Sequence, residues 1–312
     1  MPPPSALHMS PPSALHHVTA FAGDPRRNLD FYTLFLGLHL VKRTVNFDDP
    51  ATYHFYFGDA RGTPGTLLTF FPWLNAPVGR AGSGLVPAAS FAIPQNALGW
   101  WTERARAAGV ECSGPATRFR DELITLVDPA GLAVELIASE PESEERAIVG
   151  LHSATLCESD AGRTFAFLQK TLGFVLVAQE GNRTRCSSTA ATIDLLTVPD
   201  TERAKLSAGM VHHVAFRVSD EAQQVEWREK LKSAGRNVTR VIDRQYFRSI
   251  YFREPGGVLF EIATDGPGFF IDEAELGSGL RLPPWLEPLR ESIERRLPPL
   301  ASTERSSQAG IA

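Results

Sequence analysis

Hydrophobic and polar positions follow one order four times along the chain. Each repeat opens with a short run typical of a β-strand, and these runs are LHHVTAF from Leu15, PAASFAI from Pro87, LHSATL from Leu151 and VHHVAFRV from Val211. Segments with helical spacing follow, namely NLDFYTLFLG, ALGWWTERARAAG, RTFAFLQKTLG and VEWREKLKSAG, each ending at a glycine suited to the position after a helix. Short strands rich in Val, Ile, Phe, Tyr and Thr complete each unit. The pattern therefore predicts an α+β fold of four βαβββ modules.

The four modules fall into two tandem pairs. Modules one and three leave their helix through similar sequences, GLHLVKR and GFVLVAQ, whereas modules two and four close with the related hairpins DPAGLAVELIA and EPGGVLFEIAT. A charged segment without apolar period, EPESEER, separates the pairs. The predicted organisation is a disordered proline-rich extension over 1–14, a domain of modules one and two over 15–139, a linker over 140–148, a domain of modules three and four over 149–265, and a tail with a short helix over 266–312.

Composition and charge narrow the classes of function. A net charge of −5 and a pI near 5.9 disfavour nucleic acid and anionic membranes, which select basic faces. No apolar run reaches the roughly 18 residues of a membrane span, and the N-terminus lacks the basic and apolar regions of a signal peptide. Three scattered cysteines suit a reducing compartment. The sequence therefore predicts a cytoplasmic protein without nucleic-acid or membrane partners, and leaves homo-oligomerisation open.

Two His-His pairs mark the first strands of modules one and four. These pairs are His16–His17 and His212–His213, and no other His-His pair occurs in the chain. Because strand residues alternate between the two faces of a sheet, we expect only one histidine of each pair to point into the concave side. Modules one and four are therefore the two that can supply imidazoles to a common site.

A glutamate in the closing hairpin completes the comparison of the modules. The hairpins place Glu135 in module two and Glu261 in module four, whereas TLLTFF in module one offers no carboxylate. In the register that we predict, Ser90 and Ser153 fill the position of the second histidine in modules two and three. Only modules one and four together supply two histidines and a glutamate, the ligand set that leaves three positions open on non-haem Fe(II). We expect modules two and three to be structural.

The residues that carry these patterns also carry a family resemblance. From about Leu15 to the LPPWLEPLRESIE tail, the chain resembles the vicinal-oxygen-chelate (glyoxalase/extradiol dioxygenase) superfamily, and within it the hydroquinone ring-cleaving dioxygenases. The most specific stretches are LHHVT, NLDFYTLFLGLHLVKRTVNFDDP, VHHVAFRV and DRQYFRSIYFREPGGVLFEIATD. The resemblance implies cup-shaped mixed sheets built from paired modules. Carried over by position, it implies metal ligands at His17, His213 and Glu261, second-sphere histidines at His16 and His212, and pocket residues at Arg244 and Tyr251.

The predicted reaction is the opening of a hydroquinone-type ring, or alternatively a catechol-type ring, by O2 at Fe(II), with Mn(II) fitting the same ligands. The predicted partners are therefore a small aromatic diol and O2. His212 is a candidate for proton transfer, because a near-neutral pKa serves both acid and base steps. Arg244 is a candidate for stabilising an oxyanion or the hydroxyl distal to the metal, and Tyr251 for a hydrogen bond to the same substrate.

Two other functions share the scaffold. A glyoxalase-like lyase or isomerase uses four protein ligands, typically with two carboxylates, and module one lacks the second carboxylate. A non-catalytic binding protein generally lacks the two-histidine and glutamate set that this chain retains. The sequence gives His54, in TYHFYF, less weight as a site residue, and favours a turn for NFDDP, which spans Asn46–Pro50.

Overall fold

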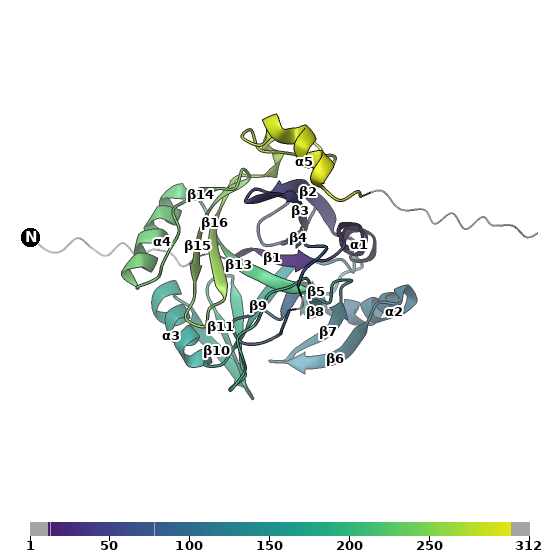
Figure 1. The fold of residues 1–312 in the computed structure, drawn as a ribbon. Coiled ribbons are helices and arrows are strands. Elements are labelled where there is room, and N and C mark those ends of the chain that lie inside the picture. Colours follow the sequence, from purple (N-terminus) through teal and green to yellow (C-terminus); the bar gives the residue numbers. More distant parts are fainter. Residues whose placement is uncertain (1–11, 13, 78, 301–312) are drawn as a thin grey trace, which may run out of the picture.

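A computed structural model describes residue 12, residues 14–77 and residues 79–300 of the chain. Four βαβββ modules follow one another, which confirms the predicted fold class (Figure 1). Most of the predicted extension, residues 1–11 and 13, and the polar end of the tail, residues 301–312, lie outside the described residues. None of the helices in the described part combines the length and the apolar character that crossing a membrane requires.

The elements of each module have the following bounds. Module one comprises β1 (Leu15–Ala22), α1 (Pro25–Asp30), a π-helical turn (Phe31–Phe35), β2 (His39–Asn46), β3 (Asp49–Gly58) and β4 (Leu67–Pro72). Module two comprises β5 (Ala88–Pro94), a 3-10 turn (Gln95–Ala97), α2 (Leu98–Ala108), β6 (Cys112–Arg118), β7 (Asp121–Val127) and β8 (Ala133–Glu140). Module three comprises β9 (Gly150–Glu158), α3 (Ala161–Leu172), β10 (Val175–Glu180), β11 (Arg183–Ser187) and β12 (Thr192–Thr197). Module four comprises β13 (Met210–Val218), α4 (Glu221–Ser233), β14 (Ile242–Asp243), β15 (Phe247–Arg253) and β16 (Leu259–Pro267).

Local sequence sets the ends of the helices. The carboxylate of Asp160 accepts a hydrogen bond from the backbone N–H of Gly162 at the start of α3, and Asp220 accepts one from Gln223 in α4. Gly173 ends α3 with φ 78°, a left-handed conformation that glycine adopts without strain. The predicted helix-ending role of this glycine is therefore confirmed.

The two sheets combine modules that are distant in sequence. One eight-stranded sheet has the order β14-β15-β16-β13-β1-β4-β3-β2, and the other has the order β10-β11-β12-β9-β5-β8-β7-β6. Modules one and four therefore share one sheet, joined by antiparallel β1 and β13, whereas modules two and three share the other, joined by β5 and β9. Each predicted sequence half contributes one module to each sheet.

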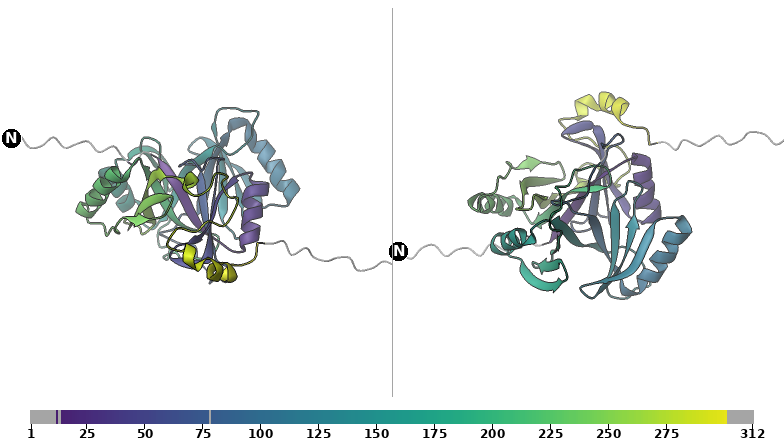
Figure 2. Two further views of the ribbon diagram at one scale, coloured as in Figure 1. Left: turned by 90° about the horizontal axis from the view of Figure 1, so that it is seen from above. Right: turned by 60° about the horizontal axis from the view of Figure 1, so that its bottom comes forward.

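Helices connect the modules that are adjacent in sequence. In the views of Figures 1 and 2, α1 lies beside α2 and α3 lies beside α4, on the outer faces of the curled sheets. Arg104 of α2 donates a hydrogen bond of 2.8 Å to the carbonyl of Phe35. On the other side, the Arg236 guanidinium lies 5.6 Å from the ring centroid of Phe167 in α3. Sheet pairing and helix packing thus cross-link all four modules.

The tail forms the short helix that its sequence predicts, α5 (Arg290–Arg296), after a 3-10 turn (Glu287–Leu289). Ile293 is buried, and it joins the hydrophobic core together with Leu282, Leu286 and Leu297. The ring of Trp285 packs edge-on against Phe47, with 5.7 Å between the ring centroids. The tail therefore covers the edge of the sheet beside β2 and β3 (Figure 1).

Candidate metal centre and substrate cavity

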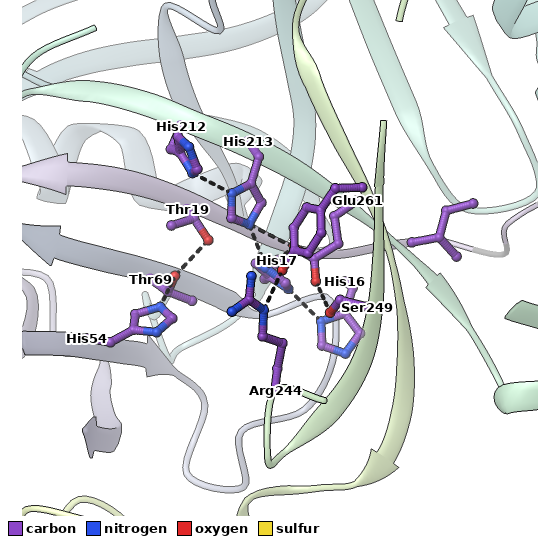
Figure 3. A network of polar contacts seen from close by, with 12 residues as sticks. His16, His17, Thr19, His54, Thr69, His212, His213, Arg244, Ser249 and Glu261 are labelled. Atoms are coloured by element: carbon purple, nitrogen blue, oxygen red, sulfur yellow. Dashed lines mark hydrogen bonds and ion pairs between the residues drawn. The ribbon is translucent and has the colours of Figure 1, made fainter. Parts of the chain in front are cut away.

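Three side chains from distant parts of the chain converge on the concave side of the sheet formed by modules one and four. His17 comes from β1, His213 from β13 and Glu261 from β16, and all three are buried (Figure 3). The Nε2 atoms of His17 and His213 lie 3.1 Å apart, and Glu261 Oε2 lies 3.3 Å from the first and 2.9 Å from the second. Among the described residues, these three form the one group of at least three His, Cys, Asp or Glu side chains close enough to share an ion.

The spacing of these atoms fits a metal ion. Ligand atoms at right angles to one another and about 2.1 Å from a common ion are about 3.0 Å apart, close to the observed separations. Burial alone would raise the pKa of Glu261, but the neighbouring imidazoles hold it well below its usual range, so the carboxylate stays charged. The second carboxylate oxygen accepts a hydrogen bond from Ser249 Oγ on β15. Glu261 is thus oriented, ionised and aimed at two imidazoles.

A second histidine orients each candidate ligand. His16 Nδ1 lies 2.8 Å from His17 Nδ1, and His212 Nδ1 lies 2.9 Å from His213 Nδ1. When the candidate ligands donate from Nδ1, the lone pairs of their Nε2 atoms point toward the Glu261 carboxylate. Three electron-rich atoms then meet without a proton between them, an arrangement that a cation stabilises.

Two bulges in the β1–β13 ladder explain how adjacent histidines reach one region. Leu15 pairs with Phe216 and His17 with Ala215, so His16 is an extra residue in β1. Farther along the ladder, Thr19 pairs with His213 and Ala20 with Val211, so His212 is an extra residue in β13. A bulge interrupts the strict alternation of faces. The expectation that only one histidine of each pair faces the concave side is therefore wrong for the second pair, because His212 and His213 both line the cavity.

The two second histidines differ in their surroundings. His16 is buried behind His17 against Phe247, with 5.1 Å between the ring centroids, and it is not part of the cavity wall. His212 lines the cavity and packs against Phe21. Burial lowers the pKa of both rings to about 3, helped by the adjacent candidate ligand in each pair. The near-neutral pKa expected for His212 is therefore wrong, because desolvation disfavours its charged form.

The cavity in front of the three candidate ligands has a volume of about 260 Å³. A cavity of about 150 Å³ is sufficient for benzene. This cavity therefore has room for one substituted ring. Its wall is formed by His17, Thr19, Phe21, Asn46, Phe47, Asp48, His54, Tyr56, Phe71, His212, His213, Arg244, Phe247, Tyr251, Leu259 and Glu261.

Arg244 and Tyr251 form a polar group within this wall. Arg244 Nε donates a hydrogen bond of 3.1 Å to the Tyr251 hydroxyl, and the Tyr251 ring packs edge-on against His213 at 5.8 Å between centroids. Asp48 accepts a hydrogen bond of 2.9 Å from Arg244 Nη1. Burial raises the pKa of Tyr251, so its hydroxyl stays protonated at neutral pH. The turn expected at NFDDP thus also supplies the carboxylate that holds Arg244.

Comparisons with known proteins agree with this architecture. The profile of the Glyoxalase/Bleomycin resistance protein/Dioxygenase superfamily matches residues 14–136 and 150–262. The chain belongs to this superfamily. Within the superfamily, it is 42% identical over 306 residues to the "Putative ring-cleaving dioxygenase MhqO" of Bacillus subtilis, with 93% of this chain and 97% of the relative covered. It is 32% identical over 308 residues to the chlorohydroquinone/hydroquinone 1,2-dioxygenase of Sphingobium indicum, covering 91% and 95% of the two chains.

Solved structures of the superfamily show the same arrangement. The crystal structure of a protein described as a putative dioxygenase from Bacillus subtilis superposes with a TM-score of 0.89 at 41% identity, covering 94% of this chain and 98% of that one. Maize glyoxalase I superposes with a TM-score of 0.62 at 16% identity, covering 81% and 92%, which shows a shared fold. The family resemblance predicted from the sequence is therefore confirmed.

One polar residue of the cavity was not among the site residues predicted from the sequence. His54 of β3 lies in the wall, where its Nε2 is 3.0 Å from Thr69 Oγ1. Thr69 Oγ1 in turn lies 2.8 Å from Thr19 Oγ1, so Thr69 links two residues of the wall, His54 and Thr19 (Figure 3). The sequence feature that could have identified His54 is the alternation in TYHFYF, which places alternate residues on the same face of a strand. This alternation does not show which of the two faces is concave.

The second sheet of this superfamily fold holds an ion pair where the first has its candidate ligands. Glu135 takes the place of Glu261 in the closing hairpin, but Arg118 donates two hydrogen bonds to it, of 2.9 and 2.6 Å. Ser90 Oγ donates a third, of 2.7 Å. Ser90 pairs with Ser153, the counterpart of His17, and the strand partner of His17 in the first sheet is Ala215. Ser90 therefore occupies the position of Ala215, and the prediction that it takes the place of His213 is wrong.

Proposed function

We propose that this chain is a non-haem Fe(II)-dependent dioxygenase that opens a hydroquinone-type ring with O2. The observation that carries the proposal is the convergence of His17, His213 and Glu261 at a cavity with room for one aromatic ring. Relatives covering more than nine tenths of the chain are described as ring-cleaving dioxygenases, one of them acting on hydroquinones. Three rather than four candidate ligands favour this reaction over that of a glyoxalase.

The proposed metal ligands are His17 Nε2, His213 Nε2 and one oxygen of Glu261. When bound, ferrous iron supplies a redox-active Lewis acid with positions open to a diol and to O2. Mn(II) suits the same donors, so the choice of Fe(II) is part of the proposal. Ser249 orients the Glu261 carboxylate through its hydroxyl. His16 acts as a positioning residue, because it contacts His17 and lies outside the cavity.

The remaining polar residues bind and orient the diol. Neutral His212 accepts the hydrogen bond from His213 at Nδ1, so its own proton lies on Nε2, from which it can donate to a substrate oxygen. Arg244 and Tyr251 offer a fixed cation and a protonated hydroxyl to a second substrate oxygen. His54, held by Thr69, is the further group that we assign to the distal hydroxyl of a para-diol. Phe21, Phe71 and Phe247 enclose the ring and exclude water.

The test is anaerobic loading with Fe(II), followed by measurement of oxygen uptake with three separate substrates. Hydroquinone, catechol and a methylglyoxal–thiol adduct distinguish the candidate reactions. We expect uptake with hydroquinone, and little turnover of the adduct. Turnover of the adduct without oxygen would establish the lyase instead, and binding of all three without turnover would establish a binding protein. Glu261→Gln serves as the control, since it keeps the shape of the side chain and removes the charge that the metal needs.

A further inference from the structure

A second cavity lies behind His212. It has a volume of about 290 Å³ and is bounded by the loops around Gly84 and Arg203 and by the ends of β13, β15 and β16. His212 and Leu259 line this cavity and also the substrate cavity, so these two side chains form the wall between the cavities. We call the second cavity the arginine chamber, because Arg203 and Arg253 both line it.

Neither guanidinium of the chamber forms a salt bridge with another described residue; the nearby carboxyl group of Glu158 interacts with Arg203 only at longer range, and burial raises the pKa of Glu158 to about 8. Within the described residues, no carboxylate oxygen lies within 4.0 Å of Arg203 or Arg253, whereas many other arginines of the chain form such pairs. Their contacts are to backbone carbonyls, and Arg253 Nη1 donates a hydrogen bond of 2.7 Å to Gly257. A guanidinium has five donor hydrogens, so both retain donors for an anion.

The turn between β15 and β16 packs closely against the guanidinium of Arg203. Its Nη1 and Nη2 donate long hydrogen bonds to the carbonyls of Gly256 and Gly257, at 3.4 and 3.3 Å. A Cβ at Gly257 would lie 1.9 Å from Arg203 Nη2, so a larger residue there would displace the guanidinium. At Gly131, the equivalent place in module two, a Cβ would meet nothing within 4 Å. The close approach is specific to the module that contributes Glu261.

The proposed reaction creates an anion of the kind that two arginines bind. One ring C–C bond breaks, both atoms of O2 enter the product, and hydroquinone with O2 gives a ring-opened hydroxymuconic semialdehyde carboxylate and one proton. The hydroxyl-bearing carbon becomes the carboxylate and its neighbour becomes the aldehyde, so O2 accepts the four electrons that these two carbons lose. The neutral diol thus becomes a longer, charged molecule beside the metal site.

We propose that the arginine chamber binds the carboxylate of the ring-opened product and favours its departure from the metal site, and that this transfer requires His212 or Leu259 to turn out of the wall between the two cavities. This inference rests on the proposed function. Arginine recognises carboxylates with paired hydrogen bonds, and two of them offer the anion an alternative to the metal. Both arginine side chains are exposed to solvent, so the chamber opens to the protein surface on the side of His212 away from the metal site.

The direct test measures the binding of cis,cis-muconate, a stable ring-opened dicarboxylate, to the anaerobic Fe(II)-loaded protein by calorimetry. We expect the double variant Arg203→Gln/Arg253→Gln to bind muconate at least ~10-fold more weakly than the wild type, since it loses the charge-assisted hydrogen bonds of two guanidinium groups. The matched control is Arg248→Gln, an arginine of β15 that pairs with Glu221 and Asp243 outside the chamber. Unchanged muconate affinity in the double variant, or no binding by the wild type, would overturn the proposal.

Turnover distinguishes a product carboxylate from a carboxylate that the substrate itself carries. With hydroquinone, we expect the double variant to keep its KM and to show a lower kcat and weaker inhibition by muconate. A loss of kcat/KM confined to 2,5-dihydroxybenzoate, with muconate inhibition unchanged, would assign the chamber to the substrate and refute the product route. Absence of oxygen uptake with every diphenol, alongside muconate binding that needs both arginines, would reject the dioxygenase and with it the product assignment, leaving a carboxylate site.

Discussion

Arg118 and Glu135 form a bidentate ion pair in the second sheet, at the position that corresponds to the candidate metal ligands of the first sheet. Arg118 lies ten residues before Asp128 of the DPAG turn, and Arg244 lies ten residues before Glu254 of the EPGG turn. Arg244 instead bonds to Tyr251 and Asp48, which leaves Glu261 free to face the two imidazoles. The different direction of this arginine, together with the two histidines that only the first sheet supplies, therefore separates a structural ion pair from a candidate metal site.

Replacement of Arg118 by alanine should destabilise the protein without changing its activity. The variant leaves the largely buried Glu135 without its cation, and the loss of one partner of such a pair costs about 3 kcal/mol. Urea denaturation measures this change, and oxygen uptake with hydroquinone measures the activity. In the control Arg118→Met/Glu135→Met both charges are absent, so the loss should be smaller. Equal stability of the single variant and the wild type would show that the pair contributes little.

Replacement of Ser249 by alanine should weaken metal binding. The Ser249 hydroxyl orients the Glu261 carboxylate, and loss of such an outer-shell partner typically lowers metal affinity about 10–100-fold. Competition with a chelator measures the dissociation constant of the metal. Ser90→Ala is the control, because the Ser90 hydroxyl also donates a hydrogen bond to a buried glutamate, Glu135, but from β5 of the second sheet. Metal affinities that fall equally in both variants would contradict the assignment of the site to the first sheet.

Replacement of Tyr251 by phenylalanine should lower kcat/KM for hydroquinone by about 10-fold, the expected effect of losing one hydrogen bond of 1–2 kcal/mol to the substrate. The ring remains to pack against His213, so metal affinity should not change. Steady-state oxygen uptake and chelator competition provide the two measurements. A rate and a cleavage position identical to those of the wild type would remove this hydroxyl from the mechanism.

Replacement of Glu158 by glutamine should stabilise the protein at alkaline pH. Burial, together with the neighbouring Glu254, raises the pKa of Glu158 from 4.5 to about 8. The folded state therefore holds a proton that the unfolded chain releases above pH 4.5, so the free energy of unfolding should fall as the pH rises from about 4.5 to 8. Glutamine keeps a donor without this titration. We expect its melting temperature to exceed that of the wild type by a few degrees at pH 8.5 and to match it near pH 4.5.

Thermal unfolding across this pH range measures the effect. Glu142→Gln, an exposed residue of the linker segment, is the control and should leave the pH profile unchanged. A pH profile of the Glu158→Gln variant that runs parallel to that of the wild type would place the titration elsewhere.

Local sequence patterns were sufficient to predict the modules, and together with the family resemblance they predicted the three candidate ligands. Alternation in strands, helical spacing and the glycine after each helix depend on neighbouring residues, so the βαβββ order could be read directly. The two His-His pairs and the glutamate of the last hairpin indicated a metal site shared by modules one and four, and the family resemblance implied that His17 and His213 are the ligands of each pair. Their convergence required only that modules one and four meet, which the structure shows.

Features that depend on pairing between distant strands were not predictable in this way. The bulges at His16 and His212 arise in the β1–β13 ladder, and a bulge depends on how two strands align. The mispredicted register of Ser90 has the same origin. The turn predicted at NFDDP is confirmed, but a sequence pattern does not show that Asp48 in this turn reaches Arg244, or that His54 lies on the concave face of β3.

The sequence by itself determined the repeated module, the family and the side chains able to bind a metal, because these follow from residue identity and short-range periodicity. Tertiary structure alone decided that modules one and four share a sheet, that Arg118 pairs with Glu135 while Arg244 does not pair with Glu261, and that His212 separates two cavities. The physical reason is that hydrogen-bond ladders and buried charge pairs form between residues far apart in the chain, where alternative pairings differ in free energy by amounts that no local pattern records.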